Sequence, residues 1–276
     1  MDLGFFLPPL VACIVLVAVH AYLGIHVLAR EVIFVDLSLA QMAALGSAVA
    51  VLAGVAPDSA HAFAYALGFT TLGAALFALT RSHGRHQRVP QEAIIGIVYV
   101  VASAAAILVA DRTPRGGEAI KDILVGSLLW VTWPQIARLA VIYVAVGIFH
   151  VVLRRRFLTI SFDPEAAAAQ GWSLRWWDFL FYLSFGIVIT FSVPILGVLL
   201  VFSFLVVPAA IAFQFTRHTG RLVLLSWGAG ILASAGGLYL SFARDLPTGP
   251  LIVCMFGLLL LLAYLVRKAI TRTVSA

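Results

Sequence analysis

The chain has 276 residues, of which 63% are hydrophobic and only 11% are charged, and its mean hydropathy is +1.08. Soluble domains carry about 25% charged residues, so a soluble protein of this composition would expose far more hydrocarbon than water tolerates. Lipid solvates such a surface, and the composition therefore indicates an integral membrane protein. The net charge of +6 does not indicate nucleic-acid binding, because no basic patch is interleaved with aromatic residues.

Polar residues divide the apolar sequence into nine candidate spans, each close to the roughly 20 residues that a bilayer requires. The first is a retained span rather than a cleaved signal, because MDLGFF lacks a basic n-region. The stretch around Pro194 is long for one span and short for two, so the prediction is eight to ten transmembrane helices in an all-α polytopic domain over residues 1–276. Residues Ile123–Trp133 are too few to cross and predict a half-helix near one face. The candidates are Leu3–Leu28, Ile33–Val55, Ala60–Thr80, Glu92–Ala110, Pro134–Leu153, Asp178–Val193, Ile195–Thr216, Leu222–Phe242 and Pro250–Val266.

The basic residues predict the orientation, because Lys and Arg accumulate in cytoplasmic loops. Nine spans place thirteen of them on one side and four on the other, which puts the N-terminus outside and the C-terminus in the cytoplasm. The thirteen are Arg30, Arg81, Arg85, Arg88, Arg154, Arg155, Arg156, Arg175, Arg217, Arg221, Arg267, Lys268 and Arg272, and the four are Arg112, Arg115, Lys121 and Arg244.

One polar segment, Leu153–Trp177, stands between two long apolar stretches and reads LRRRFLTISFDPEAAAAQGWSLRWW. Asp163 suits a helix N-cap, Pro164 suits the first helical position, and Glu165 favours the positive end of the helix dipole. Gly171 can end the helix in the left-handed conformation. The small alanines leave a smooth surface for another protein, although a solvated connecting helix has the same pattern.

Four stretches, in order along the chain, resemble the permease subunits of ATP-binding-cassette importers for zinc, manganese or iron(II). They are AYLGIHVLAREVIFVDLSLAQMAALG, FLTISFDPEAAAAQGW, LGVLLVFSFLVVPAAIA and DLPTGPLIV, and together they cover most of residues 20 to 253. The resemblance implies a type II importer-like fold. It also implies that the polar segment contacts the ATPase through Phe162, Asp163, Pro164, Glu165, Ala166 and Gly171.

The second span departs from the family pattern at the position of its plausible metal ligands. Many members have G-D-x-L-x-H-A-x-L-P-G, whereas this chain has VDLSLAQMAALG, with Asp36 displaced by one position and Gln41 in place of histidine. An amide oxygen is a poor zinc ligand compared with imidazole. Asp36 and Gln41 are therefore candidates for a low-affinity passage site. Asp36 could equally be a helix N-terminal acid paired with Arg30, and Gln41 could be a polar contact between helices.

Two further candidates lie in loops predicted to face outward. His61, beside Asp58, could receive a cation, although a histidine there is more often an interfacial anchor. Asp245 could contact a delivered metal or its delivery protein, or it could cap the turn before Pro247.

The sequence thus predicts a transport subunit that moves a divalent metal into the cytoplasm and binds no permanent cofactor. The chain has no GxxxxGK[ST], HExxH or GxSxG motif, so it is not expected to be an enzyme, and a separate ATPase would supply the energy. The expected partners are that ATPase, an extracytoplasmic metal-binding protein, a second copy of the chain and the bilayer of the cell membrane, without nucleic acid. The alternatives are an ion-gradient-driven secondary transporter and a permease for an iron chelate or a cobalamin-like cargo.

Overall fold

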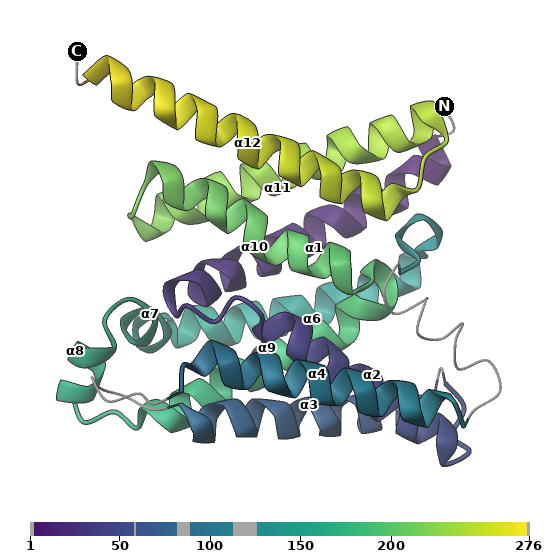
Figure 1. The fold of residues 1–276 in the computed structure, drawn as a ribbon. Helices are drawn as coiled ribbons and strands as arrows, with labels where there is room; N and C mark the ends of the chain where they lie inside the picture. Colours follow the sequence, from purple (N-terminus) through teal and green to yellow (C-terminus); the bar gives the residue numbers. More distant parts are fainter. Residues whose placement is uncertain (1–2, 58, 82–88, 113–125, 275–276) are drawn as a thin grey trace. The chain divides into compact units, whose positions relative to one another are not determined.

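The structure is a computed structural model of the 276 residues, and it describes all of them except 1–2, 58, 82–88, 113–125 and 275–276. The described residues are helical between short connections (Figure 1). The helices are α1 (Leu3–Ala29), α2 (Val35–Leu52), α3 (Ala60–Thr80), α4 (Gln91–Ala110), η1 (Leu128–Trp130), α6 (Trp133–Val152), α7 (Arg154–Phe162), α8 (Pro164–Ala169), α9 (Leu174–Leu196), α10 (Val198–Phe215), α11 (Thr219–Arg244) and α12 (Thr248–Val274).

Within the described part of the chain, nine helices are long and apolar enough to cross a membrane. They coincide with the nine predicted spans to within four residues at each end, except that α12 continues to Val274, eight residues beyond the predicted end at Val266. The prediction of an all-α polytopic protein is confirmed. The spans could be predicted because each one satisfies its own backbone hydrogen bonds and exposes apolar side chains to lipid.

The boundary near Pro194 differs from the prediction. Pro194 lies inside α9, and the chain breaks three residues later at Gly197, whose φ of +74° favours glycine. The Ser127 amide donates to the Ile195 carbonyl at 2.9 Å, so the end of α9 has a backbone partner there. A side chain at Gly126 would lie 2.1 Å from the Leu196 carbonyl carbon, which explains why this close backbone approach needs glycine.

The half-helix predicted for Ile123–Trp133 is wrong over its described part. Residues Leu128–Trp130 form one 3₁₀ turn, and α6 already begins at Trp133. The prediction failed because Gly126, with a φ of +70°, and the extended Val131 interrupt an otherwise apolar run. Residues 123–125 lie outside the described residues.

The chain folds as two compact units, each built from segments that are distant in the sequence. Unit 1 contains residues 1–28, 125–143 and 195–276, and in it α11 packs against both α10 and α12. Unit 2 contains residues 29–124 and 144–194, and in it α2 packs against both α3 and α4 (Figure 1). The sequence prediction of one transmembrane domain stays a prediction.

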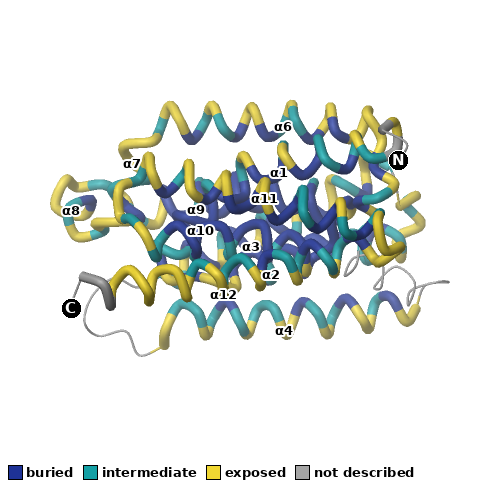
Figure 2. Tube along the Cα trace, turned by 90° about the horizontal axis from the view of Figure 1, so that it is seen from above, coloured by how far each residue is buried: buried dark blue, intermediate teal, exposed yellow. Residues whose placement is uncertain are grey.

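Helix α4 shows which faces of the helices require lipid. Its buried residues are Ile95, Ala102, Ala106 and Ala110, which form one narrow stripe (Figure 2). The other faces expose large apolar side chains, including Val101 at 62% and Leu108 at 70%. An apolar surface of this extent is stable in a bilayer but not in water.

Candidate functional site

The centre of the polar segment is helix α8, and its ends form as the sequence predicts. The Asp163 carboxylate accepts a hydrogen bond from the Ala166 amide at 2.9 Å, and Pro164 occupies the first turn. Gly171 has a φ of +73°, its amide donates to Ala168, and the Trp172 amide donates to Ala167, which is the Schellman arrangement. A six-residue helix is marginal by itself, so these two caps define where α8 begins and ends.

Most of α8 is exposed to solvent, while one face of the helix is buried against the protein. Ala167 is fully buried, whereas Asp163, Glu165, Ala168, Ala169 and Gly171 are exposed. Phe162, the last residue of α7 and directly before the Asp163 cap, is also exposed, at 42%. This part of the polar segment therefore presents two carboxylates, small side chains and one aromatic ring on a short helix of defined geometry.

Helix α7 anchors the polar segment to the rest of unit 2. Phe157 is fully buried, and its ring stacks on His150 of α6 at a centroid distance of 4.5 Å. It also meets Trp177 of α9 edge to face at 5.9 Å. The Arg156 guanidinium lies 4.5 Å above the Trp177 ring, a cation–π contact. These contacts hold α7 against α6 and α9 on the side opposite to solvent.

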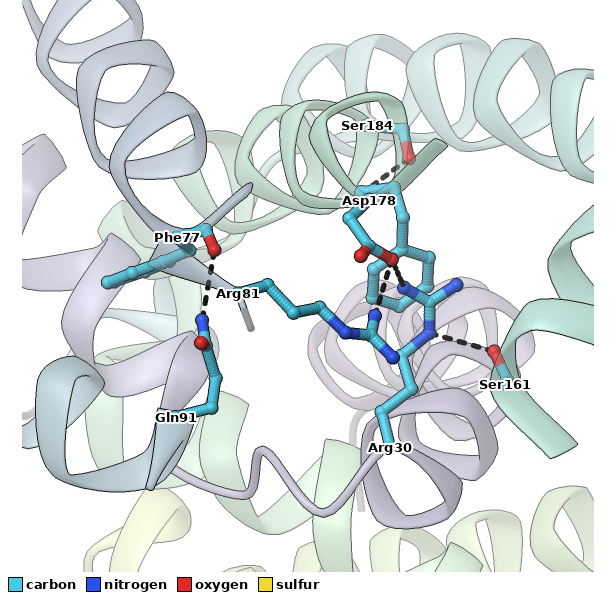
Figure 3. Close-up of polar contacts among 8 residues, drawn as sticks. Arg30, Phe77, Arg81, Gln91, Ser161, Asp178 and Ser184 are labelled. Carbon is cyan, nitrogen blue, oxygen red and sulfur yellow. Dashed lines mark hydrogen bonds and ion pairs between the residues drawn. The ribbon is translucent and has the colours of Figure 1, made fainter. Parts of the chain in front are cut away.

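A buried ionic cluster, which we call the Arg30 cluster, joins α7 to three other elements of unit 2 (Figure 3). Arg30, directly after α1, donates through Nη1 to Asp178 Oδ1 of α9 at 2.7 Å and through Nε to Ser161 Oγ of α7 at 2.8 Å. Arg81, at the end of α3, also donates to Asp178 Oδ1. The Arg30 guanidinium lies 4.0 Å above the ring of Phe181. One side chain thus contacts the polar segment and the span that follows it.

The two arginines of this cluster differ in their exposure to solvent. The side chains of Arg30 and Asp178 are fully buried, whereas that of Arg81 is 13% exposed. Burial lowers the pKa of the Arg30 guanidinium, and the charge of Asp178 opposes that shift. The guanidinium of arginine keeps its proton in proteins, so Arg30 is charged at neutral pH. The cluster therefore carries two cations and one carboxylate.

Asp36 lies in the first turn of α2 and is 1% exposed. Among the described residues, neither of its carboxylate oxygens has a side-chain partner or a hydrogen bond of good geometry, although the backbone amides of Asp36 and Leu37 approach them. The predicted alternative that Asp36 pairs with Arg30 is wrong, because Arg30 binds Asp178 instead. A second acid stands nearby, since Glu92 of α4 accepts a hydrogen bond from the Phe34 amide at 3.0 Å. Within the described chain, Asp36 is thus a buried acid without the cation that normally offsets the cost of burial.

The other metal candidates do not gather around Asp36. Gln41 is 9% exposed on the same helix, about 7 Å further along its axis at 1.5 Å per residue. His61 is exposed in an open apolar groove on α3 with Ala64 and Tyr65. Because α2 and α3 form an antiparallel hairpin, His61 lies near the opposite end of α2 from Asp36, roughly 25 Å away.

Asp245 belongs to unit 1, where it is exposed at the end of α11. Its φ of +53° and ψ of +45° place it in the left-handed region, and the Leu246 amide donates to Ser241. Asp58 lies outside the described residues. No group of three or more His, Cys, Asp or Glu residues that could hold a metal ion occurs among the residues that the structure describes.

Sequence reasoning did not identify the Arg30 cluster, although two signals were present. Asp178 is an ionisable residue at the start of an apolar stretch, and Arg30 directly follows a span. Charged residues in or beside spans usually have a partner inside the protein. The pairing itself was not predictable, because 148 positions separate Arg30 from Asp178.

These helices form a membrane protein of many spans with an exposed, double-capped helix between two of them, and comparison with known proteins identifies the class. The chain belongs to the ABC 3 transport family, whose sequence profile matches residues 2–267. The family predicted from the four motifs is therefore confirmed, and the relatives are membrane subunits of transport systems.

Two relatives and one solved structure illustrate the similarity. A probable metal transport system membrane protein of Chlamydia muridarum is 27% identical over 184 residues, which are 67% of this chain and 62% of that protein. The chain thus matches only about three fifths of that relative's length. The manganese transport system membrane protein MntC of Listeria innocua is 25% identical over 267 residues, or 96% of this chain and 91% of MntC. A chain of PsaBC from Streptococcus pneumoniae, solved with a Fab, has the same fold, with a TM-score of 0.79, 20% identity, and coverage of 95% of this chain and 92% of that one.

Proposed function

We propose that this chain is the permease subunit of an ABC importer that carries a divalent transition metal ion into the cytoplasm. The observation that carries the proposal is helix α8, which is capped at both ends, exposed on one face and anchored through α7 to the spans on the other. A transport subunit that receives movement from a separate motor needs such an element, because a flexible loop would absorb the movement.

The polar segment is the proposed contact with the ATPase. Its residues Phe162, Asp163, Pro164, Glu165, Ala166 and Gly171 would lie in a groove of that subunit. ATP binding would move two ATPase subunits together, and α8 would pass this movement through α7 to α9. The chain itself would catalyse no covalent chemistry. Two copies of the chain would form the pathway between them, and an extracytoplasmic binding protein would deliver the metal to the loops that carry Asp58, His61 and Asp245.

The proposed cargo is zinc, manganese or iron(II), and the pathway side chains favour manganese. Asp36 is a buried carboxylate without a side-chain partner in the described chain, and Gln41 offers an amide oxygen on the same helix. Carboxylate and carbonyl oxygens suit Mn²⁺, whereas imidazole and thiolate ligands suit zinc. The relatives are named for manganese and for iron transport, so this preference is based on the side chains alone.

The proposed orientation has the N-terminus outside and the C-terminus in the cytoplasm, in the cell membrane. It is supported by the grouping of Arg30, Arg81 and the start of α9 with α7 in the Arg30 cluster. The charge distribution predicts all of these positions to be cytoplasmic.

The test is capture of the ATPase, in lipid, by the wild-type chain and by Gly171→Arg. Arginine at a φ of +73° is strained, and its side chain would project from the exposed end of α8. The matched control is Gly171→Asn, because asparagine tolerates the left-handed conformation. We expect equimolar capture by the wild type and the control and loss of capture with Gly171→Arg. Metal uptake into liposomes by the chain alone under a proton gradient would refute the proposal in favour of a secondary transporter.

A further inference from the structure

We propose that Arg30 is a positioning residue for transport, which fixes the polar segment to span α9 so that movement of α8 reaches the membrane helices. This inference rests on the proposed function and assigns a role to a residue that contacts neither the metal nor the ATPase. It concerns contacts within unit 2 alone.

The directions of the hydrogen bonds carry the argument. Arg30 Nε donates to Ser161, which is two residues before the Asp163 cap of α8, and Nη1 donates to Asp178 in the second turn of α9. The face of the same guanidinium packs on Phe181, one turn further along α9. A planar guanidinium has its donors in fixed directions, so these contacts set both the distance and the rotation between α7 and α9.

Apolar packing alone would not fix this geometry. Phe157 and Ile160 of α7 are fully buried, so the attachment of α7 is already supplied by the hydrophobic effect. That effect is non-directional, whereas the N–H donors of a guanidinium define the direction of each contact. A buried ion pair contributes little net stability, because desolvation of the two charges offsets their attraction. The Arg30 contacts therefore act mainly on geometry.

Arg81 takes a different part in the cluster. It donates to the same Asp178 oxygen, but it is partly exposed and ends α3. Arg30 Nη2 and Asp178 Oδ2 have no hydrogen-bond partner among the described residues. If Arg81 moved away from Asp178, the Arg30 links to α7 and α9 would remain. Arg30 is therefore the fixed member of the cluster, and Arg81 connects α3 to it.

The experiment compares four chains, each assembled with the ATPase and the binding protein in liposomes. The chains are wild type, Arg30→Lys, Ser161→Ala and Arg267→Met. Arg30→Lys keeps the buried positive charge but loses the planar set of N–H donors of the guanidinium. Ser161→Ala removes only the hydroxyl that Arg30 contacts. Arg267→Met is the matched control, because it removes an exposed arginine in the last turns of α12. The readouts are ATPase capture, ATP hydrolysis, and labelled manganese taken up per ATP hydrolysed.

We expect Arg30→Lys to capture the ATPase like the wild type but to take up about tenfold less manganese per ATP, and Ser161→Ala to lose about threefold. Arg267→Met should match the wild type. A loss of capture and hydrolysis in step with uptake would show that Arg30 only supports folding and would overturn the inference. Unchanged uptake per ATP in both variants would overturn it as well. Failure of the wild type to capture an ATPase or to import metal would instead refute the proposed function.

Discussion

Two buried aspartates of unit 2, Asp178 and Asp36, differ in whether other side chains bind them. Asp178 is fully buried and receives hydrogen bonds from two arginines, while Asp36 is 1% exposed and its carboxylate has no side-chain partner among the described residues. Both lie in the first two turns of apolar helices, α9 and α2. The two aspartates therefore differ in the side chains packed around them and not in their position along a helix.

The difference corresponds to two roles that a buried charge can have in a protein. A paired carboxylate fixes the relative position of the elements that supply its cations, as Asp178 does for the end of α3 and for the turn that carries Arg30. An unpaired one costs stability in the apoprotein, and such residues commonly lie where a cation or a proton arrives during function. We therefore expect Asp36 to be the stronger pathway candidate, and Asp178 to act in the coupling geometry proposed for Arg30. Equivalent substitutions at the two positions can test this division.

The largest effect is expected from Asp178→Asn. The substitution removes the carboxylate that Arg30 contacts and leaves a fully buried guanidinium uncompensated. Loss of one partner of a buried ion pair costs about 3–5 kcal/mol of unfolding free energy. Chemical unfolding of the purified chain in detergent micelles measures it. A loss below about 1 kcal/mol would mean that Arg81 or water compensates and that the cluster is not closed to solvent.

The matched change, Asp36→Asn, is expected to act on transport and not on stability. The substitution breaks no side-chain contact of Asp36 among the described residues, and the Asn oxygen can still accept from the nearby backbone amides of Asp36 and Leu37. The unfolding free energy should therefore stay within about 0.5 kcal/mol of the wild type or rise. Manganese uptake by the assembled transporter should fall at least tenfold, which corresponds to about 1.4 kcal/mol. Destabilisation comparable to that of Asp178→Asn, with uptake preserved, would show that the amides of the first turn of α2 satisfy Asp36 structurally.

A third carboxylate, Asp163, gives an intermediate case because it is exposed but hydrogen-bonded. Asp163→Ala removes the cap of α8, which should cost about 1 kcal/mol and weaken binding of the ATPase roughly fivefold. Titration of the ATPase onto the chain in nanodiscs measures the affinity. Asp163→Asn is the control, because asparagine caps equally well. Equal weakening by both substitutions would point to the charge of Asp163 instead of its cap.

The smallest effect is expected from Gln41→His, which places an imidazole on the same helix as Asp36. A nitrogen ligand raises the affinity for zinc more than that for manganese. Zinc should then compete with manganese uptake several-fold better than in the wild type, without a change in stability. Competition measured with labelled manganese and unlabelled zinc checks this. An unchanged inhibition curve would separate Gln41 from the metal pathway.

The comparison also shows which contacts could be predicted from residues that are close together in the sequence. Asp163 and Gly171 could be assigned as the caps of α8 because a capping hydrogen bond joins residues only a few positions apart. The pairing of Arg30 could not be assigned, and the alternative that Asp36 is its partner was wrong. Asp36 is the nearest acid in the span that follows Arg30. The packing of α7 and α9 brings Asp178 to the guanidinium instead.

The break between α9 and α10 was likewise set by a contact with a distant segment and not by the local signal. Proline near the end of an apolar stretch was the local signal for a boundary, yet Pro194 is accommodated in the last turn of α9. Gly197 became the boundary because the backbone of Gly126 and Ser127 lies against Leu196 and Ile195, and that approach depends on a segment about seventy residues earlier.

The sequence by itself determined the class of protein, the positions of the spans, the capped helix of the polar segment and the family. These properties depend on hydropathy over about 20 residues, on local hydrogen bonds and on short motifs, all of which are local in the chain. Only the tertiary structure decided which buried charges are paired. Pairing depends on which helices pack together, because a buried charge is stabilised by whatever group packing places within about 3 Å of it, regardless of its distance in the sequence.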